Sequence, residues 1–325
     1  MTPKRLLAAL MSAAFVFSAC SGGGGSGDCV GTGNVSVGAK PWAVAADAGT
    51  RRLYSGNEFD NTISIVDLCT HAAIATLPSG IGPNSISVNH KTGVAYISNF
   101  TSNNVTVIKN DQVIQTVSVG HEPWAVLADE DAGVAYVANS VDGSVMILDA
   151  ASPTPAGSVV GFTEPRGLAR RGRTLYVADA ARNLVSVINL DTGQPVGEVA
   201  VGQRPQGMAL DPTANRLWVT NVDDASVSVV DLSSLTVVGT IAVGLSPLQI
   251  AVDPNSRRAY TANSFADTVT VIDTQSQQVI ATSKAAKKPW DVEVSQDGLY
   301  IYVANSATSE IRIFSPEQLA GSPGG

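Results

Sequence analysis

The sequence predicts an all-β fold, a seven-bladed β-propeller whose blades are four-stranded antiparallel sheets. Three observations predict it: a fixed repeat, the same strand pattern in every repeat, and an N-terminal strand that supplies what the last repeat lacks. The repeat is marked by prolines spaced 40 or 42 residues apart, namely Pro41, Pro83, Pro123, Pro165, Pro205, Pro247 and Pro289. A period of about 40 residues with several strands per repeat is typical of propellers.

Each repeat has the same order of elements, which residues 243–273 illustrate. A short apolar strand follows Pro247, a polar turn leads to a second strand that ends at Asn263, and residues 268–273 alternate polar and apolar side chains. Period-two alternation rich in Val, Ile and Thr indicates half-buried strands. Full repeats end with a fourth strand, such as residues 116–119.

The two ends of the chain complete one blade. The seventh repeat stops after its third strand, residues 311–314, whereas an extra strand of the fourth type occurs at residues 34–38. We therefore expect the N-terminal strand to complete blade seven, which closes the ring and removes an open sheet edge. The propeller is predicted to span residues 34–315, followed by a flexible C-terminal tail over residues 316–325.

The N-terminus has the pattern of a bacterial lipoprotein. Lys4 and Arg5 precede an apolar run of signal-peptide length, too short to span a bilayer. Residues 17–20, Phe-Ser-Ala-Cys, resemble a lipoprotein cleavage site, which predicts a signal peptide over residues 1–19 and lipidation at Cys20. Ordinary secretion is the alternative. The Gly/Ser-rich segment within residues 20–33 is predicted to be a flexible tether, and the residue after the cysteine favours the outer membrane, on the periplasmic side of the cell envelope.

Composition agrees with a domain outside the cytoplasm and disfavours nucleic acid. The formal net charge is −8 and only 15% of residues are charged, with no long basic run. Cys29 and Cys69 are left as a possible disulfide in an oxidising compartment. Equivalent points of adjacent blades are usually too far apart for a disulfide, but Cys29 lies on a segment that can bend across, so both outcomes stay open.

The second strands resemble the YVTN repeat of bacterial and archaeal seven-bladed propellers. The motif occurs as 96–99 YISN, 136–139 YVAN, 218–221 WVTN, 260–263 YTAN and 302–305 YVAN. The resemblance covers residues 35–314 and implies the fold, with YncE-like periplasmic proteins and lipoproteins among the members. It implies little about activity, because fold alone does not give function. We interpret the asparagines as turn formers in left-handed backbone and the aromatic residues as packing between blades.

Function is expected where the repeats differ, around the prolines. The connection into each inner strand passes one mouth of the central channel, so the residues beside the prolines form a variable ring there. The candidate ligand-binding residues in this ring are Trp42, Trp124, Trp290, Lys40, Arg166, Arg204, Lys288 and Gln206. An aromatic and basic platform suits an anionic or planar ligand, whereas solubility and rim packing explain the same residues without function.

Signs of catalysis are weak. The three histidines form no metal-binding pattern, and no nucleophile elbow or haem attachment sequence occurs. Asp291 and Glu293 in blade seven replace small or apolar residues. They are an alternative metal site or acid–base pair, as in lactone-hydrolysing propellers, although a buried pair bridged to Lys287, Lys288 or Lys40 is the simpler explanation. No catalytic residue and no cofactor are therefore assigned.

The sequence favours a monomeric, lipid-anchored propeller that acts as a non-enzymatic binding scaffold of the cell envelope. The ligand at the channel mouth is expected to be an envelope protein, a peptide or a sugar. A lactonase-like hydrolase with a divalent metal is one alternative. Binding of single-stranded DNA, borrowed from YncE-like proteins, is another, and the net charge opposes it.

Overall fold

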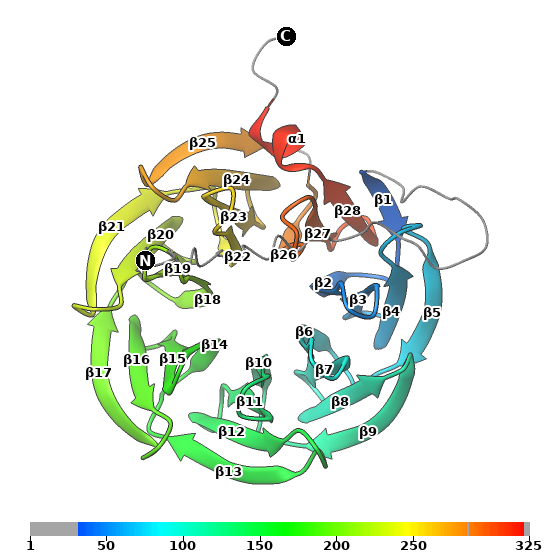
Figure 1. Cartoon of the computed structure of the whole chain (residues 1–325), viewed down its shortest axis with the longest axis horizontal. Helices are drawn as coiled ribbons and strands as arrows, with labels where there is room; N and C mark the ends of the chain where they lie inside the picture. The colour runs from blue at the N-terminus through cyan, green and yellow to red at the C-terminus, as the bar shows by residue number, and fades with distance from the viewer. Residues whose placement is uncertain (1–31, 285, 322–325) are drawn as a thin grey trace, which may run out of the picture.

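Seven four-stranded antiparallel sheets form a closed ring in the computed structural model of the protein (Figure 1). The structure describes residues 32–284 and 286–321. The predicted signal peptide, Cys20, Cys29 and nearly all of the tether lie outside the described residues. The predicted fold class and blade number are confirmed. No helix in the described part of the chain is long and apolar enough to cross a membrane.

Blades 1 to 6 each take their strands in chain order, from the channel outward. Blades 1 to 3 consist of β2 (Pro41–Asp47), β3 (Arg52–Asn57), β4 (Thr62–Asp67) and β5 (Ala73–Pro78); β6 (Pro83–Asn89), β7 (Val94–Asn99), β8 (Asn104–Lys109) and β9 (Gln112–Ser118); and β10 (Pro123–Asp129), β11 (Val134–Asn139), β12 (Ser144–Asp149) and β13 (Pro155–Val160). Blades 4 to 6 consist of β14 (Pro165–Arg171), β15 (Thr174–Asp179), β16 (Leu184–Asn189) and β17 (Gln194–Ala200); β18 (Pro205–Asp211), β19 (Arg216–Asn221), β20 (Ser226–Asp231) and β21 (Thr236–Ala242); and β22 (Pro247–Asp253), β23 (Arg258–Asn263), β24 (Thr268–Asp273) and β25 (Gln278–Ser283). Blade 7 combines β26 (Pro289–Val294), β27 (Ile301–Asn305) and β28 (Glu310–Phe314) with β1 (Gly33–Ser36).

The N-terminal strand closes the ring as predicted. β1 pairs antiparallel with β28, with Val35 opposite Ile311. The side chain of Val35 is only 4% exposed and packs in a cluster that includes Ile311 and Ile313. Closure therefore gives the last blade both a hydrogen-bonded fourth strand and part of its hydrophobic core.

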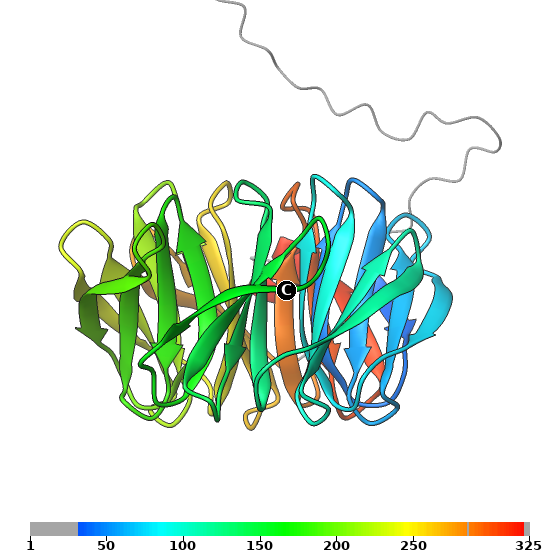
Figure 2. The same ribbon diagram turned by 90° about the horizontal axis from the view of Figure 1, so that it is seen from below.

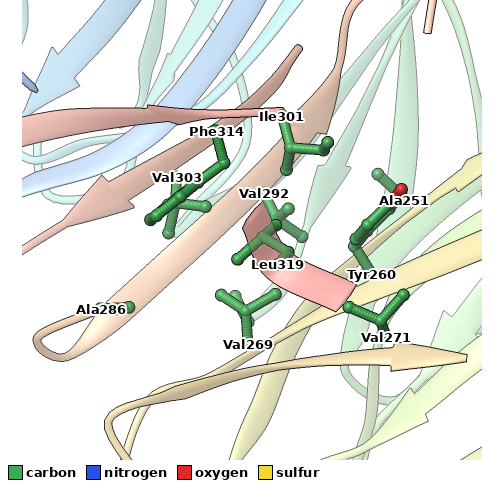
Figure 3. Packing of buried hydrophobic residues seen from close by; sticks show 11 residues of the cluster. Ala251, Tyr260, Val269, Val271, Ala286, Val292, Ile301, Val303, Phe314 and Leu319 are labelled. Carbon is green, nitrogen blue, oxygen red and sulfur yellow. The ribbon is translucent and has the colours of Figure 1, made fainter. Parts of the chain in front are cut away.

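The hydrophobic core lies mainly between neighbouring blades. Figure 3 shows the cluster between blades 6 and 7, where Tyr260 and Val271 of blade 6 meet Val292 and Ile301 of blade 7. The aromatic residue of each second strand is 0–5% exposed, as predicted for a side chain packed between sheets; these residues are Tyr54, Tyr96, Tyr136, Tyr176, Trp218, Tyr260 and Tyr302. Burial of such large side chains is the main term that stabilises the ring.

The asparagines that end the second strands do not form turns, which corrects the sequence interpretation. None of those that end the second strands has a positive φ. Asn263 is fully buried instead, and its Nδ2 donates to the hydroxyls of Thr268 (3.1 Å) and Thr270 (2.8 Å) on the third strand. A Cβ added to Gly244 would lie 2.7 Å from the Cβ of Asn263. The asparagine is therefore a buried clamp, and the repeat glycine leaves room for it.

A short helix replaces the first half of the predicted flexible tail. α1 (Pro316–Ala320) begins at Ser315, whose side chain accepts a hydrogen bond from Gln318 N (3.3 Å), and Gln318 completes a capping box. Leu319 is 1% exposed and lies in the cluster between blades 6 and 7 (Figure 3). Serine before Pro-Glu-Gln is a helix-start signal that the sequence interpretation missed.

The strands run between the two faces of a disc, which Figure 2 shows edge-on. Because the strands are antiparallel, the connections into the inner strands and the turns between second and third strands lie on the same face. Hydrogen bonds join the two sets of loops, as from Ser264 N to Ser246 O (2.9 Å) and from Ser140 N to Glu122 O (3.0 Å). We call this the proline face, because all seven repeat prolines begin the inner strands there, and the other the opposite face.

Candidate functional site

The residues before the repeat prolines are held in an unusual backbone conformation. Six of the seven have a positive φ, including Lys40 (52°), Arg204 (55°) and Lys288 (45°). The side chain of a turn residue in the preceding blade fixes this backbone, for example through Lys288 N donating to Asp267 Oδ1 (2.7 Å). Left-handed backbone costs free energy in residues other than glycine, so the proline face presents these basic side chains from a fixed framework.

Trp42 and Trp290 stack on each other at the seam between blades 1 and 7. Their ring centroids are 4.1 Å apart and the ring planes differ by 3°. Both side chains are half-buried, so one ring face of each is already covered by the other. The two tryptophans therefore form a joined pair instead of two separate stacking surfaces.

Trp124 belongs to a second cluster, in blade 3. The guanidinium of Arg166 lies 4.1 Å from its ring centroid, and Phe100 contacts it edge-on at 5.3 Å. Arg166 Nε also donates to Glu164 Oε1 (2.9 Å). Arg166 is thus occupied by an aromatic ring and a carboxylate, an arrangement that fixes Trp124 in place.

The exposed basic residues of the proline face differ in how they are paired. Lys40 Nζ lies 3.6 Å from Glu58 Oε2, and Arg204 Nη1 lies 3.5 Å from Asp223 Oδ1. Lys288 is exposed and has no salt bridge to any described residue. Exposed pairs of this kind contribute little to stability, which leaves the charges available to a partner.

The proline face also carries apolar side chains that sequence reasoning missed. They project from the turns and connections of four blades and are 54–79% exposed; they are Phe59, Ile81, Val141, Leu245 and Phe265. The opposite face has one large apolar side chain exposed in a turn, Leu299, among the described residues. The missed signal was a phenylalanine two residues after the clamp asparagine in two repeats, where a polar turn residue is usual.

An axial cavity of about 210 Å³ lies inside the ring, walled by the inner strands. Asp291 and Glu293 line it from β26, Gln249 from β22 and Gln206 from β18. Gln206 is 2% exposed, so it belongs to this cavity and not to the exposed ring where the sequence placed it.

The cavity carboxyls have strongly raised pKa values. Burial raises the pKa of Asp291 to about 7, although two backbone N–H groups, from Val44 and Val292, oppose the shift. Burial, reinforced by the neighbouring Asp291, raises the pKa of Glu293 to about 8. Both side chains keep some contact with the cavity interior, but the surrounding strands exclude bulk solvent. Near neutral pH the pair therefore exists as a mixture of protonation states.

The simpler explanation for these carboxyls, an ion pair with lysine, is wrong. Lys40 pairs with Glu58 instead, and neither Lys287 nor Lys288 forms a salt bridge with Asp291 or Glu293. The described residues contain no group of three or more His, Cys, Asp or Glu side chains suited to a metal ion. A metal at this alternative site would therefore depend on other oxygen ligands.

Cys69 is 7% exposed and disulfide-bonded. Cys29, its possible partner from the sequence, lies outside the described residues, so the Cys29–Cys69 pairing stays open. The same holds for lipidation of Cys20.

Comparison with known proteins agrees with the fold. A solved structure of hydrazine synthase from Kuenenia stuttgartiensis is similar, with 17% sequence identity and a TM-score of 0.74 over 90% of this chain and 99% of that one. Identity this low shows a shared fold alone. No curated protein sequence matches the chain. A family model described as a YNCE-like beta-propeller matches residues 206–318. That match and the ring of seven blades together confirm the YncE-like β-propeller recognised in the sequence.

Proposed function

We propose that the protein is a non-enzymatic binding scaffold whose proline face engages a partner protein or peptide. The observation that carries the proposal is the distribution of large exposed apolar side chains in the described turns and blade connections, five on the proline face and one on the opposite face. Exposed apolar side chains gathered on one face are typical of interaction surfaces. Nearby Trp42, Trp290 and Trp124 with Arg166 add the residue types enriched at binding hot spots.

The surroundings of the face suit a protein or peptide better than nucleic acid. Phe59 and Phe265 are 68% and 79% exposed, and the amino group of Lys40 lies 5.7 Å from the ring centroid of Phe59. Apolar anchors beside basic groups complement a partner that has apolar side chains and acidic residues. The net charge of −8 opposes a polyanion. A sugar ligand for the tryptophans is a narrower alternative.

We place this scaffold on the periplasmic side of the cell envelope, anchored through a lipid on Cys20, by reason of the N-terminal sequence pattern. The Gly/Ser-rich tether would then hold the propeller away from the membrane and leave the proline face accessible.

The test compares, in the native host, a double variant of the proline face with a single variant of the opposite face. Phe59→Ser with Phe265→Ser removes the most exposed anchors, and Leu299→Ser, at 60% exposure on the opposite face, is the matched control. Surface changes of this kind should leave the melting temperature nearly unchanged. Loss of two anchors worth about 2 kcal/mol each should weaken partner binding by roughly a hundredfold to a thousandfold. Equal co-purification of partners with both variants would contradict the proposal.

A lactone-type hydrolase is the second hypothesis, and the observation that favours it is the pair of cavity carboxyls with pKa values near 7 and 8. It predicts turnover of lactones that Glu293→Gln abolishes. Absence of turnover in the wild-type protein, tested with added divalent metal, would remove this hypothesis.

A further inference from the structure

Blade 7 breaks the repeat at two positions that line the axial cavity. The residues equivalent to Asp291 in blades 1 to 6 are Ala43, Ser85, Ala125, Gly167, Gly207 and Gln249. The residues equivalent to Glu293 are Ala45, Ser87, Leu127, Ala169, Ala209 and Ala251. All twelve are uncharged, so the packing of an inner strand needs no carboxyl at either position.

The two carboxyls are poorly compensated where they lie. Asp291 accepts hydrogen bonds from Val44 N (3.0 Å) and from Val292 N (2.9 Å). Glu293 has neither a hydrogen bond nor an ion pair with another residue in the described ranges, and no cationic side chain lines the cavity. A shielded carboxylate without a counter-charge is strongly unfavourable. A structure that keeps two of them side by side therefore calls for a compensating group.

Other polar groups of the cavity are unpaired as well. Gln206 Oε1 accepts from Arg166 Nη1 (3.1 Å), but its Nε2 is buried with no hydrogen-bond partner. Gln249 makes no side-chain hydrogen bond within the described part of the chain, and it extends from the strand next to β26. Buried polar groups normally have partners, and an unpaired one points to an occupant such as water or an ion.

Ser85 and Ser87 of blade 2 add two hydroxyl groups to the cavity wall, and neither donates a hydrogen bond to another described residue. Ser85 Oγ accepts from Val126 N (3.3 Å) and Ser87 Oγ accepts from Ala128 N (3.0 Å). Each hydroxyl can therefore donate its own proton into the cavity. The cavity thus combines two carboxylates of blade 7 and a glutamine amide of blade 6 with hydroxyl donors of blade 2.

We propose that the axial cavity binds one hydrated divalent cation, held by carboxylate oxygens of Asp291 and Glu293 and the side-chain oxygen of Gln249. Water fills the remaining coordination positions, accepts a hydrogen bond from Gln206 and contacts the serine hydroxyls. Hard divalent cations prefer oxygen ligands and commonly retain water. One water needs about 10–15 Å³ of such space, so about 210 Å³ holds an ion with its water shell.

The experiment is titration calorimetry of the purified propeller with Ca²⁺ and with Mg²⁺. We expect one ion per chain, with a Kd at or below about 1 mM. Asp291→Asn and Glu293→Gln should each weaken binding at least tenfold. Glu198→Gln, which removes a surface carboxylate paired with Arg182, is the matched control and should bind normally.

Unfolding curves establish that each variant is folded, and both cavity variants should be at least as stable as the wild type without metal. No heat with either ion at concentrations of several mM, or unchanged binding in both cavity variants, would overturn the proposal. Failure of this proposal leaves the proline face untouched, because the partner-binding variants lie outside the cavity.

Discussion

Replacing Glu293 with glutamine should stabilise the protein above neutral pH and leave its stability unchanged near pH 4. The pKa of Glu293 is raised from 4.5 to about 8, first by burial and then by the adjacent Asp291. Between these values the native protein binds more protons than the unfolded chain, so the free energy of unfolding falls as the pH rises. The fall begins near pH 4.5 and ends above pH 8. Glutamine does not titrate and removes this contribution.

The size of the effect follows from the shift. One pKa unit corresponds to 1.36 kcal/mol. The raised pKa of Glu293 should therefore lower the free energy of unfolding of the wild type by about 2–5 kcal/mol at pH 9. The lower figure allows for screening by water in the cavity. Asp291, with a pKa raised to about 7, should add a second and smaller dependence of the same sign.

The assay is denaturant unfolding of the wild type and Glu293→Gln at intervals from pH 4 to pH 9, with chelator present to remove divalent ions. The two curves should coincide near pH 4 and diverge as the pH rises. Glu198→Gln on the outer surface is the control and should follow the wild type. A wild-type free energy of unfolding that stays flat over this range, or a variant that gains nothing at pH 9, would refute the reasoning about the cavity.

Three further predictions test the face, the repeat and the anchor. In a double-mutant cycle of Trp42→Ala and Trp290→Ala, unfolding measurements should give a coupling of about 0.5–1.5 kcal/mol, because the two rings stack on each other; additive losses would contradict the stacked pair. Asn263→Ala should lower the free energy of unfolding by about 2–4 kcal/mol, because it leaves buried hydroxyls unpaired, and a loss under 0.5 kcal/mol would show that the clamp matters little. Cys20→Ala should move the protein from the membrane fraction to the soluble fraction with the same melting temperature, whereas a variant that still sediments with membranes would contradict lipidation.

Most of the fold could be predicted because a repeat multiplies weak signals. The alternation of residues 268–273 alone indicates only one strand, but seven occurrences at a fixed spacing predict seven blades. Closure was predictable because blade 7 lacked one strand and the N-terminus supplied one. The pairing of Val35 with Ile311 confirms this.

The roles of individual residues were harder to predict, because they depend on where side chains point. Asn263 was interpreted as a turn former, since asparagine at a strand end usually favours turns. Its side chain points into the sheet instead and bonds to the third strand. Gln206 was placed on the ring at the channel mouth, but it is 2% exposed and lines the cavity. Sequence spacing alone does not show which of the side chains after the prolines turns inward.

The candidate site was therefore predicted in part. The proline connections do mark one mouth of the channel, and Trp42 does meet Trp290 there. The exposed Phe59 and Phe265 were missed because they lie in the turns between second and third strands, whereas function was expected only beside the prolines. The cavity carboxyls were identified as unusual, but their lack of a lysine partner required the three-dimensional arrangement.

The measurement that tests the central claim most directly is site-specific photo-crosslinking in the native host. A photoreactive amino acid placed at Phe265 on the proline face is compared with one at Leu299 on the opposite face, since both positions are exposed turn residues. The binding scaffold predicts a discrete cross-linked partner from position 265 and none from position 299. Cross-linking from position 299 alone, or the same products from both positions, would contradict the assignment of binding to the proline face.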